Sequence, residues 1–146
     1  MHSNATITWD YFEGVAFVAL RPGHVVRADL DAHLADLLAR DEVTGIVVRA
    51  SEGAPNPNQR EQIHRWFERK KRRVAVLTNS KLALGGVTAL RWFGLAIRGF
   101  SSAGHDDALT FVGIAPAKLA AAKDCLRRVI AAADALARSN GSSNTT

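Results

Sequence analysis

Residues 45–50 read GIVVRA and residues 74–78 read VAVLT, two short runs made almost entirely of apolar side chains. Such runs are typical of strands that helices cover on both faces. Residues 97–100, IRGF, supply a third candidate strand. Because stretches with helical spacing separate these runs, the sequence predicts the α/β class, with a mainly parallel sheet under helical cover.

The chain before these runs predicts an antiparallel hairpin. Residues 6–11 (TITWDY) and 15–20 (VAFVAL) are rich in β-branched and aromatic side chains, and Glu13-Gly14 lies between them. This composition on either side of a glycine-containing turn is typical of two paired strands. The expected sheet is therefore mixed, with about five strands.

Helical spacing of apolar residues predicts the remaining elements. The expected helices cover residues 28–40, 58–72, 82–95, 108–112 and a long segment from Pro116 to Arg138. Residues 109–114, LTFVGI, fit a strand equally well. We expect one domain over residues 1–138, followed by a flexible polar tail over residues 139–146, SNGSSNTT.

The composition is that of an ordinary globular protein. Of the 146 residues, 47% are hydrophobic and 23% are charged. The first ten residues carry no apolar core of a signal peptide, and no apolar run approaches the roughly 20 residues that span a bilayer. The single cysteine, Cys125, excludes an internal disulfide and a multi-cysteine metal site. These features predict a cytoplasmic protein without a transmembrane segment.

The net charge of +5 is concentrated between residues 60 and 73. On a helix, Arg65, Arg69 and Arg72 fall opposite Ile63 and Phe67 and form an outward stripe, which Arg73 extends. We expect this stripe to bind a protein with an acidic surface.

Other interpretations of the same stripe stay open. Anionic lipid is one alternative partner, and nucleic acid ranks lowest because no aromatic side chain joins the stripe. The stripe also fits a solvated helix face, since Glu61–Arg65 and Glu68–Arg72 are oppositely charged pairs four residues apart.

No local motif indicates catalysis or a metal. The five histidines are scattered through the chain: His2, His24, His33, His64 and His105. Their spacing matches no metal-binding motif, and there is no P-loop or nucleophile elbow. We therefore expect no metal, no cofactor and no enzymatic activity. An active site assembled from residues distant in sequence is the alternative.

The order of these segments resembles a known family. The parts that carry the resemblance are DLDAHLADLLA (29–39), GIVVRA, VAVLTNS (74–80), ALRWFG (89–94), IRGF and DDALTFVGI (106–114). Together they resemble the SpoIIAA-like branch of the STAS fold, named for sulphate transporters and anti-sigma-factor antagonists. The resemblance covers roughly residues 6–136. It implies that residues 108–112 form a helix and that residues 97–100 form the strand before it.

The resemblance also implies a function. Members of the family are typically non-enzymatic, and the antagonists bind a partner kinase near a serine that is phosphorylated. Ser51 matches that serine by position, although Ala50 replaces the acidic residue before it. We therefore expect a regulatory or scaffold module that acts by protein–protein interaction, with a second copy of the chain among its candidate partners. Ser51 is its candidate phosphorylation site.

Two further hypotheses concern the apolar stretch at residues 83–100. Trp92 projects away from the side of its helix defined by Val87 and Leu90, so it is a candidate interface anchor. It would equally fit under the C-terminal helix. The abundance of apolar side chains there also suggests an alternative function, a carrier that binds a small hydrophobic ligand or lipid between the sheet and the helices.

Overall fold

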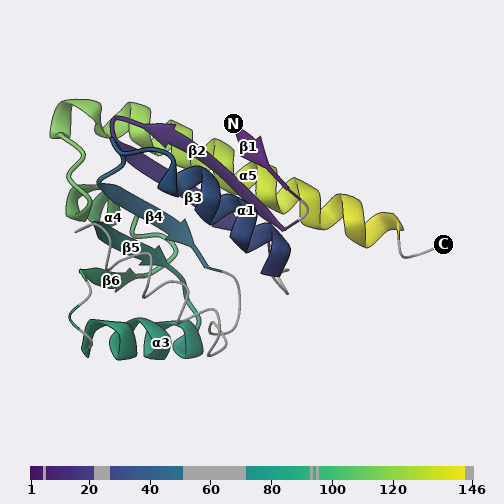
Figure 1. Ribbon diagram of the computed structural model, residues 1–146, viewed down its shortest axis with the longest axis horizontal. Coiled ribbons are helices and arrows are strands. Elements are labelled where there is room, and N and C mark those ends of the chain that lie inside the picture. The colour runs from purple at the N-terminus through teal and green to yellow at the C-terminus, as the bar shows by residue number, and fades with distance from the viewer. Residues whose placement is uncertain (5, 22–26, 51–71, 93, 95, 144–146) are drawn as a thin grey trace.

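The protein is an α/β domain built on a mixed sheet (Figure 1). The computed structural model describes residues 1–4, 6–21, 27–50, 72–92, 94 and 96–143. The expected helix at residues 58–72 lies outside this part, apart from its last residue.

The sheet has six strands in the described part, and they lie side by side in chain order. They are β1 (His2–Ser3), β2 (Ile7–Phe12), β3 (Val15–Leu20), β4 (Gly45–Arg49), β5 (Arg73–Leu77) and β6 (Ile97–Phe100). The first three strands pair antiparallel, and β3 to β6 pair parallel. The predicted mixed sheet is confirmed. The two-residue strand β1 raises the number of strands above the expected five.

The described helices follow the predicted segments closely. They are α1 (Arg27–Leu38), α3 (Lys81–Trp92), α4 (His105–Phe111) and α5 (Leu119–Ser143), with the 3-10 turn η1 (Pro116–Lys118) before α5. The helix alternative for residues 108–112 is the observed one. Helix α5 continues past the end predicted at Arg138, because extending an existing helix fixes only one further residue per hydrogen bond.

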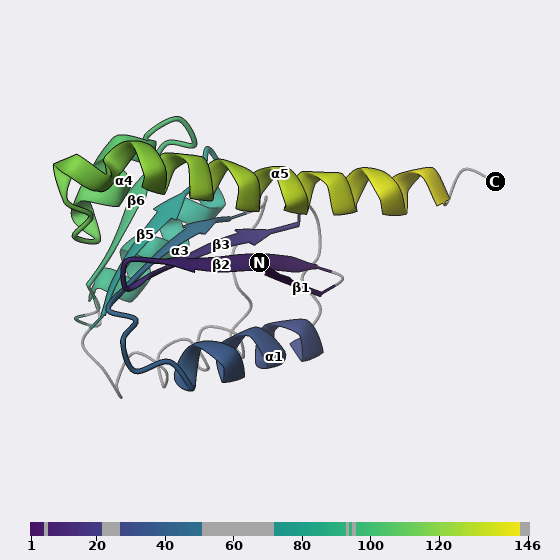
Figure 2. The ribbon, with the colours of Figure 1, turned by 90° about the horizontal axis from the view of Figure 1, so that it is seen from above.

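The two faces of the sheet carry separate cores. Along β3, the side chains of Phe17 and Ala19 join a cluster with α4 and α5, whereas Ala16 and Val18 join a cluster with α1 and Val87 of α3. This alternation follows from the two-residue period of a strand. Figure 2 shows α1 and α5 on opposite sides of the sheet.

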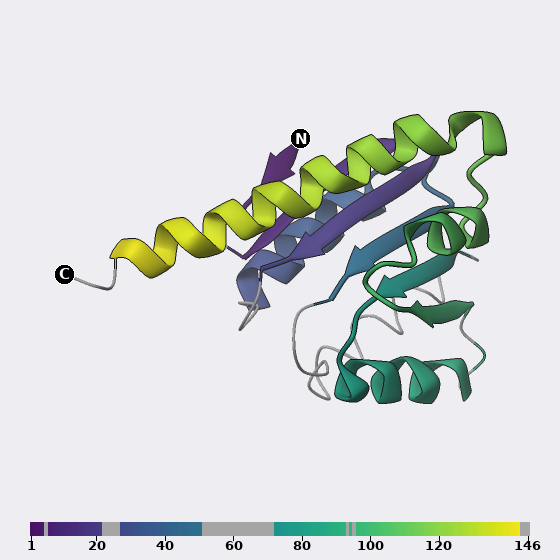
Figure 3. The same ribbon diagram turned by 180° about the vertical axis from the view of Figure 1, so that it is seen from behind.

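Two ion pairs position α5 along the sheet. Near its start, Lys118 Nζ lies 3.1 Å from Glu13 Oε1 in the turn between β2 and β3. Further along, Asp134 Oδ1 lies 2.9 Å from Arg49 Nη2 at the end of β4. The helix therefore runs in the direction of the parallel strands and lies beside α4 (Figure 3).

Candidate functional site

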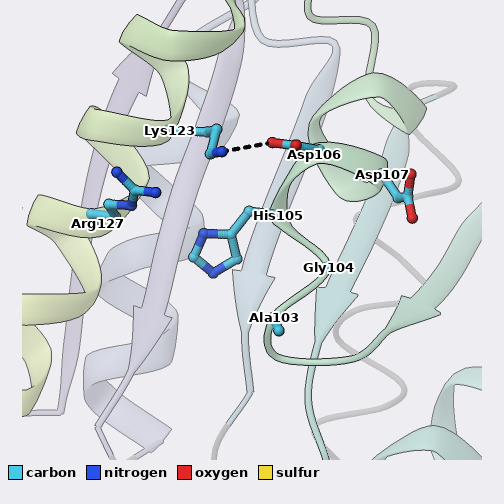
Figure 4. A pocket seen from close by; sticks show the side chains of 7 residues that line it. All are labelled: Ala103, Gly104, His105, Asp106, Asp107, Lys123 and Arg127. Atoms are coloured by element: carbon cyan, nitrogen blue, oxygen red, sulfur yellow. Dashed lines mark ion pairs between the residues drawn. The ribbon is translucent and has the colours of Figure 1, made fainter.

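A polar depression of about 340 Å³ lies between α5 and the segment that follows β6. Figure 4 shows the residues that line it. They are Ala103, Gly104, His105, Asp106, Asp107, Lys123 and Arg127. Because β6 belongs to the parallel part of the sheet, the depression adjoins the carboxyl ends of parallel strands, the side on which open α/β sheets usually bind ligands.

Local structure places the lining side chains together. A turn closed by the bond from Gly104 N–H to the Ser101 carbonyl, 2.9 Å long, precedes α4, so that His105 is the first residue of that helix. On α5, Lys123 and Arg127 are four residues apart and therefore project from the same face. The depression thus has one wall from each segment.

The two cations of the α5 wall differ in how fully they are paired. Lys123 Nζ lies 3.0 Å from Asp106 Oδ1, which is a close ion pair across the depression. Arg127 Nη1 lies 3.9 Å from Asp124 Oδ1, and the Arg127 side chain is 61% exposed. The side chain of Asp107 points away from His105 (Figure 4). Arg127 is thus the more weakly paired cation.

The imidazole of His105 lies near both of these cations. Its pKa is lowered from the ordinary value of 6.5, first by burial and then by the charge of Arg127, with a smaller effect of Lys123. A hydrogen bond with the Ser102 backbone and the charge of Asp106 oppose this shift. His105 is therefore mainly neutral at pH 7, and the lining offers cationic and neutral donors around an open space.

A second polar cluster joins α1 to the edge of the sheet. Asp36 Oδ2 accepts hydrogen bonds from Trp9 Nε1 at 2.8 Å and from the Tyr11 hydroxyl at 2.5 Å. The guanidinium of Arg40 lies 3.9 Å from the centre of the Tyr11 ring and 3.6 Å from Asp36. Burial acts to raise the pKa of Asp36, but these hydrogen bonds and the cation hold it below its ordinary value. The carboxylate is engaged by its neighbours, so this cluster pins α1 to β2.

His33 lies beneath this cluster and is 4% exposed. Its ring centre is 4.8 Å from that of Trp9. Burial lowers the pKa of His33 to about 4, although the charge of Asp36 opposes the shift. The imidazole is thus neutral at pH 7 and is packed as part of the core.

The single thiol is also part of a core. Cys125 is 3% exposed, and its Sγ lies 4.0 Å from Asp10 Oδ2. Burial, followed by the charge of Asp10, raises the pKa of the thiol. A thiol that is buried and protonated is a poor nucleophile. Cys125 is therefore a packing residue of the core.

Several predicted site residues fall outside the described part of the chain. They are Ser51, Arg65 and Arg69. Trp92 ends α3, but its side chain is likewise outside what the structure describes. The expected phosphorylation site, interface anchor and most of the basic stripe therefore stay predictions.

The two remaining members of the basic stripe have different environments. Arg72 is 2% exposed. The prediction that it lies on an outward face is therefore wrong. Arg72 immediately precedes β5, where the chain enters the sheet, and helical spacing no longer determines its direction. Arg73 is exposed at the start of β5, and its Nη1 donates a 3.3 Å hydrogen bond to the Phe111 carbonyl.

Sequence reasoning missed the depression. His105 is one of five scattered histidines, and no local motif marks Asp106 or Asp107 as part of a site. The available signal was the four-residue spacing of Lys123 and Arg127, but it does not say which segment α5 faces. Across the residues that the structure describes, no group of three or more His, Cys, Asp or Glu side chains could hold a metal ion.

Comparisons with protein-family models, with curated proteins and with solved structures found no match. The resemblance to the SpoIIAA-like branch of the STAS fold therefore stays a prediction. Within the described residues, no helix has both the length and the apolar character needed to cross a membrane.

Proposed function

We propose that this protein is a non-enzymatic regulatory or scaffold module that binds an acidic surface of another protein through the depression between α4 and α5. The observation that supports this is the exposed guanidinium of Arg127 at the rim of a depression lined by polar side chains. Arginine is suited to such contacts because its planar group can bind a carboxylate through two parallel hydrogen bonds.

The charge pattern around the depression favours an acidic partner. The ion pair between Lys123 and Asp106 leaves the weakly paired Arg127 as the main source of positive potential. An acidic side chain of a partner would replace the long contact to Asp124 with a direct one. The resemblance to a family of regulatory proteins points to the same class of function, and a second copy of this chain is one candidate partner.

The alternative function, a carrier of a hydrophobic ligand, gains no support from this depression. Among its seven lining residues only Ala103 and Gly104 lack a polar side chain. Apolar ligands are held mainly by hydrophobic and aromatic side chains.

The proposal is tested by reversing one charge. The wild type, Arg127→Glu and Arg138→Glu would each be used to capture proteins from a lysate of the native host. Arg138 is the matched control, because it is an exposed arginine on the same helix but does not line the depression. The captured protein would then be identified, purified and titrated by calorimetry at low and high salt.

We expect the wild type and Arg138→Glu to bind the partner alike. Arg127→Glu should weaken binding by about tenfold or more, because one attraction is replaced with a repulsion. Affinity for the wild type should also fall with added salt. A partner that binds all three proteins equally would contradict the proposed surface. Sedimentation of the purified chain over a range of concentrations would show whether the partner is a second copy.

A further inference from the structure

Two polar groups of the depression face each other, and none of the described acidic residues makes a close ion pair with either of them. His105 is supplied by the start of α4, and Arg127 is supplied by α5 (Figure 4). The carboxylate of Asp106 is already held by Lys123 at 3.0 Å, and Asp107 points away. The space beside the imidazole and the guanidinium is therefore lined on two sides by nitrogen donors.

Such an arrangement has the chemistry of an anion site. Guanidinium groups bind phosphate and carboxylate oxygens through two N–H groups at once. A protonated imidazole adds a further charged donor, since both ring nitrogens then carry hydrogen. Lys123 contributes positive potential at the same rim while remaining paired.

We propose that this depression binds an oxyanion, either a phosphate group or a carboxylate, between Arg127 and His105, and that the imidazole takes up a proton from solvent as the anion binds. This inference rests on the proposed function, because it names the chemical group that the partner would present. It adds that binding is linked to pH.

The linkage follows from the charges that face His105. In the free protein, burial and the cations Arg127 and Lys123 disfavour the imidazolium, whereas Asp106 and the Ser102 backbone favour it. A bound anion would add an opposite charge close to the ring, which favours the protonated form. By reciprocity, the anion must bind more tightly at the lower pH at which His105 is protonated.

Nuclear magnetic resonance can measure this coupling directly. The imidazole carbon signals of the purified protein would be titrated with pH in sodium chloride, in sodium phosphate and in N-acetylglutamate, all at equal ionic strength. A His105→Gln variant identifies the His105 signal among the five histidines. Arg127→Gln removes the proposed anion donor, and Arg138→Gln is the matched control.

In the wild type and in Arg138→Gln, we expect the bound anion to raise the pKa of His105 by about one pH unit. In Arg127→Gln, the pKa in chloride alone should be higher than in the wild type, because a cation is lost, and the added anion should change it little. A response to phosphate alone assigns the site to phosphate groups, and one to N-acetylglutamate alone assigns it to acidic side chains. A response to both supports a general oxyanion site.

The inference is overturned if neither anion changes the pKa of His105, or if Arg127→Gln responds as strongly as the wild type. That result would leave the protein–protein proposal intact if the partner still requires Arg127. Conversely, a coupled response in the absence of any protein partner would support the anion site alone.

Discussion

The hydroxyl of Tyr11 donates a 2.5 Å hydrogen bond to Asp36 Oδ2, and this bond joins strand β2 to helix α1. The same carboxylate accepts a bond from Trp9. One acidic side chain therefore satisfies two aromatic donors that lie on the same face of β2. The contact makes the ionisation of Tyr11 a sensitive measure of how α1 packs.

Tyr11 should remain protonated in alkaline solution well beyond the range in which an ordinary tyrosine ionises. Burial, then the hydrogen bond to Asp36 and its negative charge, raises the pKa of the phenol. Tyr11 is the only tyrosine in the chain, so the tyrosinate absorbance reports it without interference from another tyrosine. Native protein at pH ~11 should show little of this absorbance, whereas denatured protein should show it fully.

A matched pair of variants tests whether Asp36 raises the pKa of Tyr11. Asp36→Asn removes the carboxylate charge, so Tyr11 should ionise at a lower pH than in the wild type. Asp31→Asn, at an exposed position on the same helix, should leave the titration unchanged. Equal titrations in all three proteins, with circular dichroism showing that they are folded, would exclude the Asp36 contact as the cause.

The stability of the fold should decrease as the pH falls from about 6.5 to about 4, because of His33. Its pKa is about 4 in the folded protein and near 6.5 when unfolded, so the unfolded chain binds a proton first. The contribution of neutral His33 to the stability of the fold is complete above pH ~6.5 and is lost as the pH falls toward 4. A difference of this size corresponds to about 3 kcal/mol in the free energy of unfolding. Urea titrations at a series of pH values would measure it.

Replacing His33 with leucine should flatten most of this pH dependence. His105 contributes in the same direction, since its pKa is also lowered, so a smaller slope should remain. The double variant His33→Leu/His105→Gln should remove that remainder as well. Below about pH 4, protonation of Asp36 would destabilise all of these proteins, because its pKa is lowered too. If His33→Leu keeps the full slope above pH 4, the buried imidazole is not its source.

Cys125 should react slowly with a thiol reagent in the native protein. It is 3% exposed, and burial together with Asp10 raises its pKa. Because the chain has a single cysteine, the reaction has one rate in each state. We expect the native rate at pH 8 to be at least ~10-fold below that of the denatured chain. Comparable rates in the two states would show that the packing of α5 on β2 opens readily.

The strands and helices could be predicted from the sequence because each one depends on a pattern within its own segment. The apolar run at residues 45–50 predicts β4, and the helical spacing at residues 28–40 predicts α1. Both elements lie close to the expected bounds. The two-residue strand β1 was missed because His2–Ser3 is too short to show a period. Its pairing depends on β2 lying beside it.

The depression could not be predicted because it depends on which helix faces which loop. His105 and Arg127 are separated in the sequence by a helix and a 3-10 turn. The residues next to each of them show no pattern that predicts that both line one depression. For Arg72, a local pattern gave a wrong prediction. Helical spacing placed it outward, but the start of β5 carries it into the interior, where it is close enough to Asp41 for that charge to affect its pKa.

Gly45 should be intolerant of any side chain, because it lies at the start of β4 directly under the end of α4. A Cβ atom at this position would lie 2.9 Å from Val112 Cβ and 3.0 Å from the Val112 carbonyl oxygen. The second contact is with backbone, so relief requires α4 to move relative to the sheet. Gly45→Ala should therefore lower the free energy of unfolding by about 1–3 kcal/mol.

Gly85 provides the matched control for the same chemical change. It lies inside α3, and a Cβ atom added there would meet nothing within 4 Å. Because alanine favours helix over glycine, Gly85→Ala should raise the free energy of unfolding by about 0.5–1 kcal/mol. Urea denaturation of the two variants should thus shift the midpoint in opposite directions. Shifts of the same sign would mean that α4 does not contact β4 as closely as these distances require.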